Sequence, residues 1–181
     1  MKAKPSGKTG NVTIEMGSRD EALMEAASSP FRMRRILVPV DFSDCSQKAL
    51  QYALPLARSQ QAALTLAHVV HPVYTVGEYG ALDTAQIEAT MKAGAEKELA
   101  KLAASASGEG PPVNTVVRIG PPAREIIEVA NDLAADLIVI STHGRTGLKH
   151  ILLGSVAEQV VRHAPCPVLV VREREREIIV N

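Results

Sequence analysis

DLIVISTHGRTGLKHILLGSVAEQVVRHAPCPVLVV, residues 136–171, contains a strand pattern, a glycine-containing loop, a helix pattern and a second strand pattern. Leu137–Ile140 is a continuous apolar run, which is typical of a strand buried on both faces of a parallel sheet. Ser155 with Glu158 three residues later fits the capping-box pattern and predicts a helix start there. Residues 167–172 predict the second strand.

The loop between the first strand and the helix has the composition of an anion-binding site. Gly144, Gly147 and Gly154 allow a ligand to approach the backbone closely, and Arg145 and Lys149 add positive charge. The N–H groups and the dipole at a helix N-terminus also favour a negative ligand. Short glycine patterns also occur in ordinary turns, so loop composition alone leaves both interpretations open.

Strand and helix patterns alternate through the chain before this stretch. The predicted strands cover residues 36–40, 63–70, 113–119, 137–140 and 167–172. The predicted helices cover residues 44–58, 83–104, from 122 to about 133, and from the residue after Gly154 to about 163. This alternation predicts an α/β fold in which a parallel sheet carries helices on both faces. In such sheets, ligands bind outside the carboxyl ends of the strands, where the strand order reverses.

The first predicted helix, residues 44–58, has clear signals at its start and a proline near its end. Ser43 is a predicted N-cap, and Asp44 in the first turn suits the helix dipole. We expect Pro55 to kink or shorten the helix.

Asp41 follows the first predicted strand, as the glycine loop follows the fourth. If these strands are neighbours, Asp41 faces the loop across one crevice. As a structural residue, Asp41 would cap helix 44–58. As a functional residue, it would accept a hydrogen bond from a ribose hydroxyl or contact Mg²⁺ beside phosphates. These two roles are compatible.

Composition argues against several classes of function. The chain has 181 residues, a formal net charge of +0, 3% aromatic residues and no tryptophan. We therefore expect no nucleic-acid partner, since stacking aromatics and a basic excess are missing. We also expect no membrane partner, because there is no 18-residue apolar run and no signal-peptide pattern. Two isolated cysteines, Cys45 and Cys166, suit a reduced cytoplasmic protein.

The two ends of the chain differ from the middle. Residues 1–32 are polar and rich in Lys, Gly and Pro, and we predict a largely disordered arm with at most one helix, from Ser18 to about Ala27. Residues 33–172 form the predicted domain. Residues 173–181 begin with alternating Arg and Glu, which is typical either of a solvated tail or of an edge strand that pairs with another subunit.

The domain resembles the universal stress protein family over residues 34–171. The resemblance rests on six segments: Val38-Pro39-Val40-Asp41-Phe42-Ser43, His68-Val69, Gly120-Pro121-Pro122, Ser141-Thr142-His143-Gly144, Gly154-Ser155 and Pro165-Cys166-Pro167-Val168. It implies an adenine nucleotide alpha hydrolase-like fold with a five-stranded parallel sheet of order 3-2-1-4-5. It also implies a homodimer, often formed through the last strand.

The ATP-binding branch of this family carries Gly, two residues, Gly, nine residues, Gly, then Ser or Thr. Gly144, Gly154 and Ser155 match this pattern, while Ser141 stands in place of the first glycine. The resemblance implies a nucleotide site that comprises Pro39, Val40, Asp41, Val69, Ile140, Ser141, Gly144, Arg145, Gly147, Gly154, Ser155 and Val156. In that site, Asp41 and Val69 would meet the adenosine, and residues from Gly144 to Val156 would meet the phosphates.

These observations predict a cytoplasmic, dimeric stress-response protein that binds ATP or AMP, with or without Mg²⁺ at Asp41. We expect at most slow ATP hydrolysis, because no residue is an evident base for the attacking water. The alternative is a nucleotide-free dimerisation or adaptor module of the same family, which the glycine replaced by Ser141 favours. A hydrolase built on Asp41, Ser141 and His143 ranks third.

Overall fold

The computed structural model describes residues 2–6, 11–15, 32–72, 84–107, 110, 112–142 and 153–172. Contacts between Cα atoms divide the chain into two compact units, Met1–Arg32 and Met33–Asn181. In the part of the chain that is described, no helix has the length and apolarity needed to span a bilayer.

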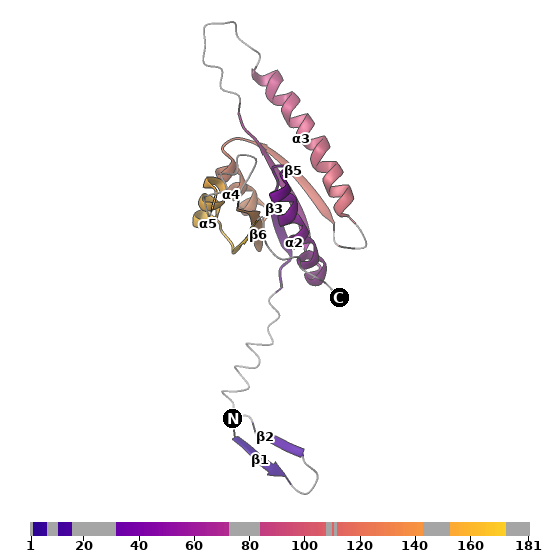
Figure 1. The fold of residues 1–181 in the computed structure, drawn as a ribbon, viewed down its shortest axis with the longest axis vertical. Helices are drawn as coiled ribbons and strands as arrows, with labels where there is room; N and C mark the ends of the chain where they lie inside the picture. Colours follow the sequence, from indigo (N-terminus) through magenta and orange to yellow (C-terminus); the bar gives the residue numbers. More distant parts are fainter. Residues whose placement is uncertain are drawn as a thin grey trace. The chain divides into compact units, whose positions relative to one another are not determined.

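The larger unit is built on a five-stranded parallel sheet (Figure 1). Its elements are β3 (Arg35–Pro39), α2 (Asp44–Gln60), β4 (Ala63–Val70), α3 (Thr84–Ala106), β5 (Val113–Ile119), α4 (Pro122–Asp132), β6 (Leu137–Ser141), α5 (Ser155–His163) and β7 (Val168–Val171). The strand order is β5-β4-β3-β6-β7, which confirms the predicted order 3-2-1-4-5.

The strand order reverses between β3 and β6, and the two strands pair over a short distance. Their ladder contains only Ile36↔Leu137 and Leu37↔Ile138, whereas β3 pairs with β4 from Arg35↔Ala63 to Pro39↔Ala67. Both β3 and β6 continue beyond this two-pair ladder. The sheet therefore opens at the carboxyl ends of β3 and β6, the position at which parallel α/β sheets bind ligands.

Helices cover both faces of the sheet, as predicted. On one face, Ile36 and Val38 of β3 belong to a buried cluster with residues of α2 and α3. On the other face, Leu37 belongs to a second cluster with residues of α4 and α5 (Figure 1). Side chains alternate between faces along a strand, so a strand covered on both faces consists of consecutive apolar residues.

Helix α2 begins as predicted but does not end at its proline. The Ser43 side chain accepts a hydrogen bond from the Ser46 N–H, which confirms Ser43 as the N-cap. The expected shortening by Pro55 was wrong, because the helix extends to Gln60, beyond the predicted end at residue 58. Pro55 removes the donor that would reach the Gln51 carbonyl, and Gln51 is exposed, so water can satisfy that carbonyl.

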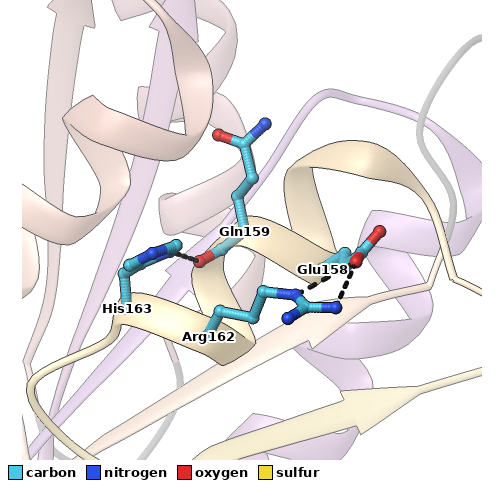
Figure 2. Close-up of polar contacts among 4 residues, drawn as sticks. All are labelled: Glu158, Gln159, Arg162 and His163. Atoms are coloured by element: carbon cyan, nitrogen blue, oxygen red, sulfur yellow. Dashed lines mark hydrogen bonds and ion pairs between the residues drawn. The ribbon is translucent and has the colours of Figure 1, made fainter.

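Helix α5 begins one residue earlier than the capping-box pattern implies. Gly154 is its N-cap, Ser155 is the first helical residue, and no side chain caps the helix. The capping-box prediction was therefore wrong. Figure 2 shows polar contacts between Glu158 and Arg162 and between Gln159 and His163 in this helix. Arg162 donates to the Glu158 carboxylate at 2.9 and 3.0 Å, and His163 Nδ1 lies 2.9 Å from the Gln159 carbonyl.

The smaller unit contains an antiparallel hairpin that the sequence analysis did not predict. Its strands are β1 (Lys2–Ser6) and β2 (Asn11–Glu15), paired from Lys2↔Glu15 to Ser6↔Asn11. The sequence signal for a hairpin was the connection of four residues, 7–10, which begins and ends with glycine. The polar composition of residues 1–32 favours disorder and outweighs this short-range signal. The predicted helix from Ser18 and the tail of residues 173–181 lie outside the described residues.

Candidate functional site

A cavity of about 250 Å³ lies at the carboxyl ends of β3, β4 and β6, next to the starts of α4 and α5. Its lining residues are Pro39, Val40, Asp41, Ala67, His68, Val69, His71, Pro122, Ile126, Ile140, Ser141, Thr142, Gly154, Ser155, Val156 and Ala157. Every predicted site residue that the structure describes is in this set. Gly144, Arg145 and Gly147 lie outside the described residues.

Several lining residues were not predicted from sequence. His68 and Ala67 directly precede Val69 in β4, so their place at the carboxyl end of a strand was a usable signal. Pro122 and Ile126 come from α4, and they reach the cavity because α4 packs against β4. Nothing in the sequence around Ile126 distinguishes the cavity from the ordinary apolar core.

The turn between β3 and α2 fixes the Asp41 carboxylate. Its Oδ1 accepts hydrogen bonds from the Ser43 N–H at 3.1 Å and from the Ser43 hydroxyl at 2.5 Å. The Asp41 N–H donates to Ser46 Oγ at 3.4 Å. Asp41 therefore forms an Asx-type turn immediately before the helix, and the N-cap role belongs to Ser43.

His68 contacts residues 40 and 42, which lie on either side of Asp41 in the chain. Phe42 has a φ of 64°, a conformation that is rare for a bulky side chain. Its ring lies against the His68 ring, with centroids 4.6 Å apart. His68 Nδ1 lies 2.7 Å from the Val40 carbonyl oxygen, which can only accept a hydrogen bond, so Nδ1 carries the proton.

The opposite side of the cavity is the junction between β6 and α5. The Gly154 N–H donates to the Thr142 carbonyl at 2.8 Å, and the Thr142 N–H donates to the Val171 carbonyl at 3.0 Å. The first N–H groups of an α-helix have no partner within the helix. Ser155, Val156 and Ala157 form this first turn and line the cavity, so the positive end of the α5 dipole faces it.

The wall between these two polar ends is apolar. Val69, Ile126, Ile140 and Val156 contribute aliphatic side chains to the cavity. A carboxylate at one end, an apolar wall and a helix N-terminus at the other end suit a ligand with hydroxyls, a flat apolar ring and an anionic group. Among the described residues, no three His, Cys, Asp or Glu side chains are placed to hold a metal ion.

Comparison with known proteins shows the family of this chain. The model of the universal stress protein family matches residues 33–172, which is more than half of the chain. The chain belongs to the universal stress protein family. This confirms the resemblance that was based on the sequence segments between Val38 and Val168.

Individual members of the universal stress protein family are similar over most of this chain. Universal stress protein MJ0531 of Methanocaldococcus jannaschii is 38% identical over 144 residues, covering 80% of this chain and 85% of the relative. The solved structure of UspA from Lactobacillus plantarum is 32% identical with a TM-score of 0.70, covering 78% of this chain and 99% of that one. A universal stress protein from Archaeoglobus fulgidus, solved in complex with dAMP, is 25% identical with a TM-score of 0.54, covering 76% and 96%.

Proposed function

We propose that this universal stress protein binds an adenine nucleotide, ATP or AMP, in the cavity at the carboxyl ends of β3, β4 and β6. The observation that carries the proposal is the placement of Asp41 and the N-terminus of α5 around one cavity with an apolar wall. The dAMP complex of the Archaeoglobus fulgidus relative supports the choice of nucleotide class.

Each part of the nucleotide has a matching group. The base packs against Val69, Ile126 and Ile140, and a sugar hydroxyl donates to the Asp41 carboxylate. The phosphates lie at the first turn of α5, where N–H groups that have no partner within the helix, together with the helix dipole, favour an anion. Gly144 and Arg145, predicted from the sequence pattern alone, add backbone and charged contacts to the phosphates.

The serine at the first motif position is compatible with this proposal. Ser141 is the last residue of β6 and pairs with Val171 in the sheet, so its backbone conformation does not require glycine. It is 8% exposed and lines the cavity. A small side chain at this position narrows the cavity slightly. Because the narrowing is slight, Ser141 leaves room for a nucleotide, and this favours nucleotide binding over the nucleotide-free adaptor function.

Bound phosphates would bring Mg²⁺ into this cavity. Mg²⁺ in nucleotide sites is held by phosphate oxygens and one or two carboxylates and keeps several waters. Asp41 is the carboxylate that lines this cavity. We therefore propose Mg·ATP as the bound form, with Asp41 as the protein's contact to the metal or to the sugar.

The proposed activity is regulation through a cytoplasmic homodimer, with hydrolysis slow at most. Strand β7 pairs with β6 on one side and forms one edge of the sheet. Leu169 on β7 is 37% exposed and Val161 on α5 is 46% exposed, which leaves apolar surface at this edge. A second copy that pairs along β7 would cover Leu169 and satisfy the open edge.

Isothermal titration of nucleotide-stripped protein tests the proposal. We expect Mg·ATP and AMP to bind with micromolar affinity at one site per chain, and Mg·CTP to bind at least roughly tenfold more weakly, because a pyrimidine fills less of the apolar wall. Light scattering on the same samples reports the oligomeric state. Absence of binding by both adenine nucleotides, together with a stable dimer, would favour the adaptor function.

A further inference from the structure

We propose that His68 is a positioning residue that fixes the orientation of the Asp41 carboxylate toward a bound sugar. This inference rests on the proposed nucleotide site and adds a role that the sequence pattern did not assign. His68 lies near the end of β4, lines the cavity, and contacts both chain neighbours of Asp41.

The first contact holds residue 40. The Val40 N–H donates to the Ala67 carbonyl at 2.8 Å, which is the last backbone bond between β3 and β4. The Val40 carbonyl lies beyond that bond, and the His68 side chain donates to it through Nδ1 at 2.7 Å. His68 therefore extends the pairing of the two strands by one group, up to the peptide that links residue 40 to Asp41.

The second contact holds residue 42. A positive φ at a bulky residue is strained and persists only when surrounding contacts fix it. Phe42 has φ 64°, packs against the apolar cluster of α2 and α3, and places its ring 4.6 Å from the His68 ring. This backbone turn brings Asp41 Oδ1 within hydrogen-bond distance of the Ser43 N–H and hydroxyl.

One side chain thus constrains the residues on both sides of Asp41. A side chain that is already held in place loses less conformational freedom when it contacts a ligand. A purely structural histidine would stabilise the fold equally with or without a sugar hydroxyl in the cavity. A positioning histidine affects only those ligands that use Asp41, so ligand selectivity separates the two roles.

Two amide variants form a matched pair. His68→Asn places an N–H donor at the same number of bonds from Cβ as Nδ1, and His68→Gln places it one bond farther away. Both variants remove the ring contact with Phe42, so their difference isolates the hydrogen bond to Val40. We expect His68→Gln to weaken ATP binding roughly five- to tenfold, and His68→Asn to weaken it less than about threefold.

The selectivity test uses 2′,3′-dideoxyATP, which has no sugar hydroxyl for Asp41. We expect His68→Gln to change the affinity for this analogue less than about twofold. In protein that already carries Asp41→Asn, we expect His68→Gln to change the affinity for ATP less than about twofold as well. Thermal unfolding of each variant reports its stability. If His68→Gln does not fold, Phe42→Leu is used instead, because it removes the ring contact and keeps His68. We expect Phe42→Leu to weaken ATP binding more than it weakens binding of the analogue.

Equal losses for ATP and the dideoxy analogue, or full additivity with Asp41→Asn, would overturn the positioning role. If the wild-type protein binds ATP and the variants show such equal losses, only the role of His68 is refuted. Wild-type protein that binds no adenine nucleotide would refute the proposed function, and the role of His68 with it.

Discussion

The backbone N–H of Gly154 donates a hydrogen bond to the Thr142 carbonyl at 2.8 Å, which brings the end of β6 directly beside the start of α5. Both residues line the cavity, so this hydrogen-bonded junction is part of its wall. This relationship places the α5 N-terminus at the opening between β3 and β6.

Replacing Gly154 tests whether the α5 N-terminus binds phosphates. We expect Gly154→Val to weaken ATP binding at least roughly tenfold, because its side chain occupies space that phosphates need next to the backbone. Gly94→Val is the matched control, since a Cβ at Gly94 meets nothing within 4 Å in helix α3. Titration calorimetry measures both affinities. Unchanged affinity in folded Gly154→Val would remove α5 from the site.

The core prediction concerns Leu99, the fully buried leucine of α3. Leu99 is 0% exposed and belongs to the cluster of α2, α3 and the sheet. We expect Leu99→Ala to lower the free energy of unfolding by about 3 kcal/mol through lost burial and a residual cavity. Met91→Ala, at a position on the same helix that is 44% exposed, should cost less than about 1 kcal/mol in urea unfolding. Similar costs would mean that α3 does not pack as described.

Asp136 stabilises the start of β3. Its Oδ2 accepts hydrogen bonds from the backbone N–H groups of Arg34 at 2.7 Å and Arg35 at 2.9 Å. We expect Asp136→Ala to lower the free energy of unfolding by about 1–2 kcal/mol, since hydrogen bonds to a charged group are lost. Asp132→Ala removes only the exposed ion pair with Arg118 and should cost less than about 1 kcal/mol. The reverse order of the two costs in urea unfolding would contradict the assignment.

The same carboxylate affects the Cys166 thiol. Burial raises the pKa of Cys166 above its ordinary value, and the negative charge of Asp136 raises this pKa further. Because the thiolate is the reactive form, Cys166 should alkylate slowly at neutral pH and faster as pH rises toward its raised pKa. Asp136→Asn keeps an oxygen acceptor and removes the charge, so the pKa should fall and alkylation at a fixed pH should speed up.

Iodoacetamide labelling of a Cys45→Ser background, followed by mass spectrometry across a pH series, measures the Cys166 pKa. Cys45 is the other cysteine of the chain and is replaced so that the signal comes from Cys166 alone. An unchanged or higher midpoint in Asp136→Asn would show that the carboxylate does not act on this thiol.

Local signals predicted most of the sheet, because its strands have unambiguous patterns. The predicted ranges 63–70 and 113–119 match β4 and β5 as observed, and Ser43 caps α2 as expected. The sheet order came from family resemblance, since local patterns do not encode which strands pair. Residues one or two positions after β3 and β6, such as Asp41 and Thr142, lie at the cavity because parallel strands end at one edge.

The failures have a common physical cause, which is that tertiary context outweighed a local rule. Pro55 does not end α2, because that helix is held by burial of Ala53 and Ala57 on either side of it. Ser155 does not cap α5, because Gly154 already takes the cap position through its bond to Thr142. Ile126 was missed because its place at the cavity depends on neighbours that are distant in the sequence.

The most direct test of the central claim is a ¹⁵N–¹H NMR titration of the stripped protein with Mg·ATP. We predict that the amide signals of Val69, Asp41, Gly154 and Ser155 shift in a saturable manner, because these residues line the proposed site. The amide of Gly94, on the exposed surface of α3, should not shift. Saturable shifts confined to other residues, or no shifts at millimolar nucleotide, would contradict an adenine nucleotide site in this cavity.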